Sequence, residues 1–226
     1  MTTRIAEAGL LRLLAWLSPA FPTGGYTYSH GLEWAVETGD VRDEATLRAW
    51  LRDVLTLGAG WSDAILLRAA WRGAAEPETL SELAELAAAV APCRERRLET
   101  LAQGDAFLRA AAPWGGEAIL IRLARPDGVA YPVAVGALAG AHGVEEDAAC
   151  AGFLQAFAAN VISAAVRLIP LGQNAGLRVL AALQPVVSDV AAETRRAGLD
   201  DLGGACFRSD IAAMRHETQY TRLFRT

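Results

Sequence analysis

Apolar residues recur at helical spacing along nearly the whole chain. The first stripe, at i, i+3, i+4 and i+7, consists of Leu10, Leu13, Leu14 and Leu17. It predicts a first helix whose leucines face a core, and Pro19 would stop that helix. Because the same periodicity continues downstream, the pattern predicts an all-helical chain.

Capping and breaking residues delimit the helices that follow. A helix is expected from near Thr27 to about Thr38, with Gly39 as its C-terminal signal. Asp43 then suits the N-cap of another helix. The expected core face of this helix consists of Leu47, Trp50, Leu51, Val54 and Leu55. Glycines interrupt the chain again before residues 62–73, where the next helix is expected.

Two helices are expected between residues 77 and 112. Pro77 suits the first turn of a helix that would bury Leu80, Leu83, Leu86 and Val90. A charged helix should follow from Cys93 to Ala112, with its inward face formed by Leu98, Leu101 and Leu108. Its charged residues are interpreted as a solvated face with i,i+3 and i,i+4 pairing: Arg94, Glu95, Arg96, Arg97 and Glu99.

The longest and most apolar helix is expected over residues 145–168, in the middle of a bundle. One polar line remains on it, formed by Asn160, Ser163 and Arg167. In the preceding helix, Gly136 and Gly140 form a pair of small residues one turn apart. Such a pair predicts that two helices pack closely.

The last part of the chain changes character. A helix beginning at Gly172 is expected to be kinked or split by Pro185. Its inward residues are expected to be Leu177, Leu180 and Val187. From Gly198 the glycines and aspartates indicate a mobile linker. We therefore expect an all-α domain over residues 1–197 and a linker with a partner-binding segment over residues 198–226.

The tail, Thr221 to Thr226, holds Leu223 and Phe224 between Arg222 and Arg225. Aromatic residues and arginines are enriched at interface hot spots, so the tail suits an interface anchor. The alternative is a tail that docks on its own domain. The fold expected overall is a single-domain helical bundle of about eight to eleven helices with a flexible C-terminal tail.

One stretch stands apart from the helical pattern. This opening stretch, Ser18 to Trp34, begins with two prolines and continues through Gly24-Gly25 into an aromatic and polar sequence. A connection that merely joins two helices would be shorter and more polar. The stretch is therefore either a buried inter-helix loop or a surface that a partner recognises.

Composition narrows the possible functions. The net charge of −5 provides no overall basic field for nucleic acid. All 21 basic residues are arginine, which excludes chemistry that needs lysine. The three cysteines are scattered, and we expect no apolar run long enough to span a bilayer. These features predict a soluble, cytoplasmic protein.

Catalytic and metal-binding motifs are not found in the sequence. The three histidines lack ligand spacing, and no nucleophile elbow or phosphate-binding loop is present. We therefore expect no catalytic residues, no metal site, no cofactor and no enzymatic activity. The enzymatic alternative is a general acid–base pair formed by His30 and Glu33, which stand three apart on one face of the expected helix.

Separated stretches of the chain resemble, in the same order, the signatures of the UreF family of urease accessory proteins. The stretches are Ser18–Glu33, Glu99-Thr-Leu with Gly104, Tyr131-Pro-Val-Ala with Gly136, Arg167-Leu-Ile-Pro-Leu-Gly-Gln, and Met214–Thr226. The resemblance covers essentially the whole chain. It differs locally at Leu177, where the family commonly has a polar residue, and at Phe207, near a usual proline.

The resemblance implies a non-enzymatic, all-α protein that assists nickel insertion into urease. Family members assemble with the accessory protein UreD/UreH and with the GTPase UreG, and this complex acts on the urease apoprotein. They are typically homodimers, and neither nucleic acid nor a membrane is implied as a partner. The nucleotide site would belong to UreG.

The resemblance also assigns partner-binding residues. They lie in the opening stretch, in the mid-chain signature and in the C-terminal segment: Tyr26, Ser29, His30, Glu33, Arg167, Gln173, Arg215, His216, Glu217, Arg222 and Phe224. In the family, the C-terminal segment orders on binding UreD/UreH. An alternative role is regulation of GTP hydrolysis by UreG through Arg215 or Arg222, acting as an arginine finger.

Overall fold

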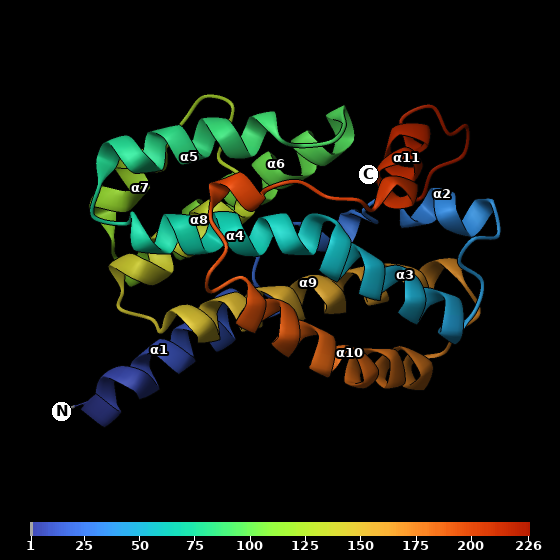
Figure 1. Cartoon of the computed structure of the whole chain (residues 1–226), viewed down its shortest axis with the longest axis horizontal. Coiled ribbons are helices and arrows are strands. Elements are labelled where there is room, and N and C mark those ends of the chain that lie inside the picture. Colours follow the sequence, from blue (N-terminus) through green and yellow to red (C-terminus); the bar gives the residue numbers. More distant parts are fainter. Residues whose placement is uncertain (1) are drawn as a thin grey trace.

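The computed structural model describes the backbone of residues 2–226 and the side chains of residues 7–226. This part of the chain contains α-helices and short 3-10 helices and no strand, which confirms the all-α prediction (Figure 1). The α-helices are α1 (Thr2–Trp16), α2 (Leu32–Glu37), α3 (Glu44–Leu57), α4 (Ala59–Arg72), α5 (Pro77–Ala89), α6 (Arg94–Ala111), α7 (Glu117–Leu123), α8 (Tyr131–Ala141), α9 (Glu146–Leu168), α10 (Gln173–Glu193) and α11 (Phe207–His216). The 3-10 helices are η1 (Gly25–Thr27), η2 (Ala112–Trp114) and η3 (Leu199–Asp201).

Helices α4 and α8 form the closest helix pair of the core, and α4 runs across the middle of Figure 1. A Cβ atom on Gly136 would lie 2.1 Å from the carbonyl oxygen of Leu67, and one on Gly140 would lie 2.4 Å from that of Trp71. No side chain fits at such distances. The predicted close packing at these glycines is confirmed.

The capped helix α3 also follows its prediction. Asp43 accepts a hydrogen bond from the backbone N–H of Thr46 at 2.8 Å, while the hydroxyl oxygen of Thr46 accepts one from the backbone N–H of Asp43 at 3.0 Å. All the residues of its expected core face are buried. They pack mainly against α10 and α4.

Helices α9 and α10 are the two longest, and Pro185 leaves α10 continuous. Contrary to expectation, both are long and apolar enough to span a membrane, with mean hydropathies of 1.6 and 1.3. Half of the most apolar window of α9 is buried inside the protein. Since α9 packs against α10, α4, α8 and α2, it has the surroundings of a core helix.

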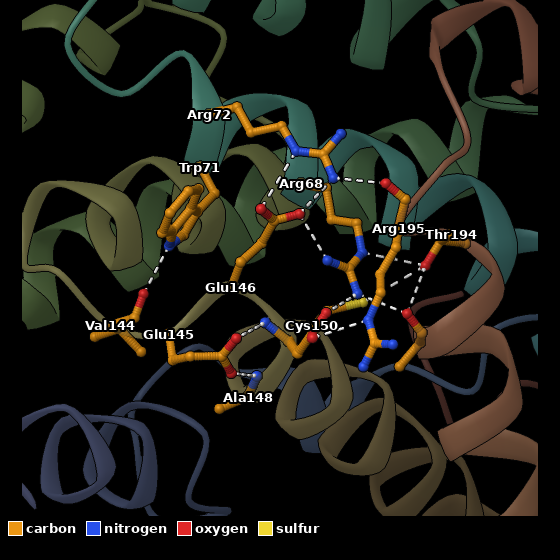
Figure 2. Close-up of polar contacts among 12 residues, drawn as sticks. Arg68, Trp71, Arg72, Val144, Glu145, Glu146, Ala148, Cys150, Thr194 and Arg195 are labelled. Carbon is orange, nitrogen blue, oxygen red and sulfur yellow. Dashed lines mark hydrogen bonds and ion pairs between the residues drawn. The ribbon is translucent and has the colours of Figure 1, made fainter. Parts of the chain in front are cut away.

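A buried arginine ties α4 to the start of α9 and the end of α10 (Figure 2). Arg68 donates to Glu146 at 2.6 Å, to Asp147 at 2.8 Å and to the carbonyl oxygen of Ala191 at 2.6 Å. Its Nε also donates to the hydroxyl of Thr194. Two carboxylates and one carbonyl oxygen near the end of α10 thus compensate the buried charge.

Several expected core faces are wrong. In α1, Leu13 and Trp16 are buried, whereas Leu10 and Leu14 are 56% and 62% exposed. The physical reason is that α1 projects from the body of the protein, so the helix has few neighbours along its length (Figure 1). Three further residues that the pattern predicts to be buried are exposed: Val90, Leu98 and Leu177.

Two helix starts differ from the prediction because of glycine. Helix α2 begins at Leu32, well after Thr27, because His30 and Gly31 adopt positive φ angles of 60° and 76°. Helix α4 begins at Ala59, before residue 62. Gly60 permits this start, since a Cβ atom there would lie 2.7 Å from the Cα of Leu55.

Residues 198–206 cross the start of α4 and are held to it. The indole N–H of Trp61 donates to the carbonyl oxygen of Asp201 at 3.0 Å. The backbone N–H of Ala205 donates to the carbonyl oxygen of Leu57 at 2.8 Å. This path carries the chain to α11, which packs beside α2 at one end of the molecule (Figure 1).

Candidate partner-binding site

The opening stretch and the tail meet at the end of the molecule formed by α2 and α11. Ser29 donates from both its backbone N–H and its hydroxyl to the carbonyl oxygen of Thr226, each at 2.6 Å. The N–H of Arg225 donates to the carbonyl oxygen of Thr27 at 2.9 Å. Phe224 and Thr226 are buried, so the tail docks on its own domain, as in the alternative that the sequence left open.

Glu33 holds the tail from inside. Its carboxylate accepts hydrogen bonds from the backbone N–H groups of Leu223 at 2.7 Å and Phe224 at 2.9 Å. The position of Glu33 follows from Gly31, where a Cβ atom would lie 2.7 Å from the backbone nitrogen of Ala213. This close approach brings the start of α2 against α11, which places the carboxylate under the tail.

His216 connects Glu33 to α6. Its Nε2 lies 3.1 Å from Glu33 and its Nδ1 lies 2.6 Å from Glu95, and the ring is fully buried. A neutral imidazole donates from only one nitrogen, so a proton on the second nitrogen or on a carboxyl group is needed to satisfy both contacts. Arg222 adds an ion pair to Glu95 at 2.8 Å, and Glu217 accepts from the N–H of Glu95 at 3.4 Å.

A second set of buried charges lies on the next turn of α6. Glu99 binds Arg96 and accepts a hydrogen bond from the hydroxyl of Thr226 at 2.7 Å. His30 lies 3.6 Å from Glu99 and packs its ring against Phe157. Burial lowers the pKa of His30 to about 4, and the charge of Arg96 acts in the same direction. Burial alone would raise the pKa of Glu99, but Arg96 and His30 outweigh it and hold this pKa below its ordinary range.

These charges form one ionic cluster, defined as His30, Glu33, Glu95, Arg96, Glu99, His216 and Arg222. The charge pattern of α6 predicts a solvated face that includes Glu95, Arg96 and Glu99, and for these three the prediction is wrong because all of them are buried. The tail and α11 cover this part of α6, and they supply the opposite charges and donors. In the sequence, the only signal for this part of α6 is the Glu99-Thr-Leu stretch, which resembles a family signature.

The polar line on α9 fixes the middle of the opening stretch. Asn160 donates to the carbonyl oxygen of Gly25 at 2.9 Å, and Arg167 donates to that of Tyr26 at 2.7 Å. The guanidinium of Arg167 also lies 4.4 Å from the ring centroid of Phe224, a cation–π distance. Arg167 therefore links the opening stretch to the tail.

Exposed apolar side chains lie on the segments that the ionic cluster holds: the opening stretch, the tail and α11. Tyr26 is 68% exposed although its backbone is held, and Leu223 is exposed beside the buried Phe224. On α11 the exposed residues Phe207, Ile211 and Met214 stand at i, i+4 and i+7. Buried charges thus hold a rigid frame from which apolar side chains project into solvent.

Most of the residues assigned to partner binding come together here. The exceptions are Gln173, which lies at the start of α10, and Arg215, whose side chain points to solvent. His30 and Glu33 share no helix face, because His30 precedes α2. His30 contacts Glu99 and Glu33 contacts His216, so the acid–base pair of the enzymatic alternative is not formed.

A groove of about 1050 Å³ lies beside this surface, between α1, the opening stretch and α9. Leu10 and Leu14 line it from α1, and Gly152 and Ala156 line it from α9. Asp63 also lines the groove, and burial raises the pKa of its carboxyl to about 7. The exposed leucines of α1 therefore belong to a concave apolar surface.

The fold and the site together define the class of protein. It is an all-α protein in which buried charges hold three surface segments in place: the opening stretch, α11 and the tail. The family model of UreF matches residues 41–184. The urease accessory protein UreF of Bradyrhizobium sp. (strain ORS 278) is 54% identical over 222 residues, which cover 97% of this chain and 92% of the relative. That of Brucella ovis is 52% identical over 224 residues, which cover 99% and 97%. The chain belongs to the UreF family of urease accessory proteins.

Proposed function

We propose that this protein is a non-catalytic adaptor that bridges UreD/UreH and the GTPase UreG in the complex that activates the urease apoprotein. The observation that carries the proposal is the ionic cluster, which holds the opening stretch, α11 and the tail as one frame. Buried charges cost free energy and are often kept for specificity. Here they would specify one presentation of Tyr26, Leu223 and the exposed residues of α11.

We assign the apolar side of α11 and the tail to UreD/UreH. Removing Thr221–Thr226 should weaken its binding while the helical circular dichroism spectrum is retained, because α11 keeps its contacts with α2. Co-expression with UreD/UreH and UreG followed by co-purification tests the adaptor role. Absence of a stable complex with either partner would contradict the proposal. If the variant without Thr221–Thr226 loses its fold, the tail is a structural element and not a binding segment.

Arg167 and Tyr26 support a partner surface on the opening stretch that is distinct from α11. Because Arg167 holds the carbonyl of Tyr26, Arg167→Gln should loosen the exposed tyrosine without disturbing the core. Tyr26→Ala should weaken capture of UreG or UreD/UreH while melting behaviour stays unchanged. Ile121→Ala, at an exposed apolar residue on α7 outside both proposed surfaces, is the control.

We infer a homodimer formed through α1. Leu10, Leu11 and Leu14 are exposed on the projecting helix and stand on one face of it, next to the groove. A second copy would bury leucines that a monomer leaves in water. Leu10→Ser/Leu14→Ser should shift the mass measured by light scattering from dimer to monomer. A monomeric wild-type chain, or a variant that stays dimeric, contradicts this assignment.

The second candidate function is regulation of GTP hydrolysis by UreG. Arg215 favours it over Arg222, because the side chain of Arg215 is exposed on α11 whereas Arg222 is engaged with Glu95. Arg215→Ala should then lower the hydrolysis rate within the assembled complex by about 10³-fold, the effect of an arginine finger. Arg94→Ala, at another exposed arginine, is the control. An unchanged rate in Arg215→Ala removes this candidate.

The proposal also places the protein in the cytoplasm, where the complex would insert nickel as its cargo. Membrane and nucleic acid have no part in it. The net charge of −5 supports the second exclusion. Cell fractionation with urease apoprotein present tests the location, and recovery in the membrane fraction would contradict it.

A further inference from the structure

A separate pocket of about 610 Å³ lies where α5, α6 and the segment after α7 meet. It shares no lining residue with the groove beside α1. Three arginines from different elements line it: Arg97 from α6, Arg122 from the end of α7 and Arg125 from the turn that follows. Neither the proposed adaptor surfaces nor the ionic cluster use them.

The three arginines differ in how they are held. Arg125 is anchored, since its Nη2 donates to the hydroxyl of Ser81 at 2.5 Å and to the carbonyl of Ser81 at 3.2 Å. Arg97 and Arg122 are exposed, and within residues 7–226 neither side chain makes an ion pair or hydrogen bond. The pocket thus combines one fixed guanidinium with two whose donors are available.

Two carboxylates, those of Glu85 and Asp127, also line the pocket and offset part of its positive charge. Glu85 lies 3.4 Å from Arg125 and is partly compensated by it. Asp127 is exposed on the turn. The arginines outnumber the carboxylates, which gives this pocket a positive excess in a chain whose net charge is −5.

The remaining wall is apolar and rigid. Ala84, Ala88 and Leu101 supply apolar surface. On the opposite side, Gly128 adopts a φ of 82°, and a Cβ atom there would lie 2.9 Å from the carbonyl oxygen of Leu101. The turn is therefore pressed against α6, which fixes this part of the pocket wall before a ligand binds.

We propose that this pocket binds a small organic anion. Its carboxylate or phosphate group would accept hydrogen bonds from Arg97 and Arg122, whose planar guanidinium groups match both oxyanions. Its apolar body would lie against Ala84 and Ala88. The volume is in the range of small-molecule sites, which are typically about 300–1,000 Å³.

The test uses the full chain and NMR titration with phenyl phosphate as the probe. Saturable shifts are expected at the backbone amides of Ala88, Ala124 and Gly128. Titration with benzoate shows whether the pocket prefers a carboxylate or a phosphate. Inorganic phosphate has the anionic group without the apolar body, and benzyl alcohol has the apolar body without the anionic group, so both should bind more weakly. Absence of saturable shifts at Gly128 with both phenyl phosphate and benzoate overturns the proposal.

Charge variants make the test specific. Arg97→Gln and Arg122→Gln should each weaken binding by about threefold to tenfold, the effect of losing one charge-assisted contact at a partly exposed site. Neither arginine is paired, so thermal stability should be unchanged. Arg196→Gln, at an exposed arginine beyond α10, is the matched control. Equal binding by the wild-type chain and an Arg97→Gln/Arg122→Gln double variant also overturns the proposal.

Discussion

Ser29 and Thr226, which stand 197 positions apart in the chain, are joined by two hydrogen bonds of 2.6 Å to one carbonyl oxygen. The hydroxyl of Ser29 also accepts from the N–H of Glu33 at 3.3 Å, so the same side chain supports the start of α2. One fully buried serine therefore couples the tail to the helix whose carboxylate holds it.

Ser29→Ala should loosen the tail without unfolding the domain. The substitution removes the hydroxyl and leaves the backbone bond, so the tail should lose about 1–2 kcal/mol of local stability. Hydrogen exchange of the amides of Leu223 and Phe224 measures this loss. Ser188→Ala, on the exposed side of α10, should leave these amides unchanged. Equal protection in Ser29→Ala and the wild type contradicts the coupling.

His216→Phe should destabilise the whole domain. The phenyl ring keeps the space filled but has no nitrogen atoms, so the substitution leaves the buried carboxylates of Glu33 and Glu95 without their shared polar partner. Breaking a buried charge arrangement typically costs about 3–5 kcal/mol. Urea unfolding at neutral pH measures the loss, and Glu95→Gln added to His216→Phe should recover part of it. His142→Phe is the matched control, because that ring is only half-buried and packs edge-on against Trp16.

The pH dependence of stability should carry a contribution from His30. Its pKa is lowered from 6.5 to about 4, so the unfolded chain takes up a proton in this range that the folded chain does not. The stabilisation that comes from the neutral His30 is fully present above pH 6.5, the ordinary pKa of histidine, and it is lost as the pH falls toward 4. His30→Asn removes the effect and tolerates the positive φ of 60°. The advantage of the wild type over the variant should shrink by roughly 3 kcal/mol between about pH 7.5 and about pH 4.

Asp63 should contribute to the pH dependence of folding stability with the opposite sign to His30. Burial raises its pKa from 3.8 to about 7, so the folded chain keeps a proton that the unfolded chain has lost. Stability from this group falls as pH rises through this window. Asp63→Asn should therefore gain stability relative to the wild type as pH rises, as measured by chemical unfolding at a series of pH values. Asp189→Asn on the exposed side of α10 is the control, and parallel curves for Asp63→Asn would refute the assignment.

Gly136→Ala should separate α4 from α8. The added Cβ atom would lie 2.1 Å from the carbonyl oxygen of Leu67, and a backbone atom cannot rotate away. The expected loss is about 3 kcal/mol or more, at the upper end of overpacking costs. Gly9→Ala is a matched helical control, because its Cβ atom would meet Val144 at an ordinary 3.6 Å. That control should be neutral or slightly stabilising in thermal unfolding.

Local chemistry explains which parts of the fold could be predicted. The cap at Asp43 and the close approach at Gly136 depend on neighbouring residues or on glycine itself, and both were recognised. The orientation of α1 depends on what lies beside it, which a leucine stripe does not contain. Leu10 and Leu14 therefore looked like core residues although they line an open groove.

The site was predictable only in part, for a related reason. Ser29, Glu33 and Phe224 lie in segments with recognisable signatures, and they do come together. Glu95 and Arg96 lie on a helix whose charges match a solvated face in every local respect. They are buried because segments more than a hundred residues away cover them, and helical periodicity carries no information about such partners.

The span between Ser29 and Thr226 also bears on biosynthesis. The helices of the bundle make most of their contacts without the tail, so they can fold while the ribosome is still adding residues. Until Thr226 has emerged, however, the hydroxyl of Ser29 lacks its acceptor, and the buried Glu99 lacks one of its hydrogen-bond donors. A chain that stops before Thr226 would therefore be folded over most of the bundle yet unfinished at the end formed by α2 and α11.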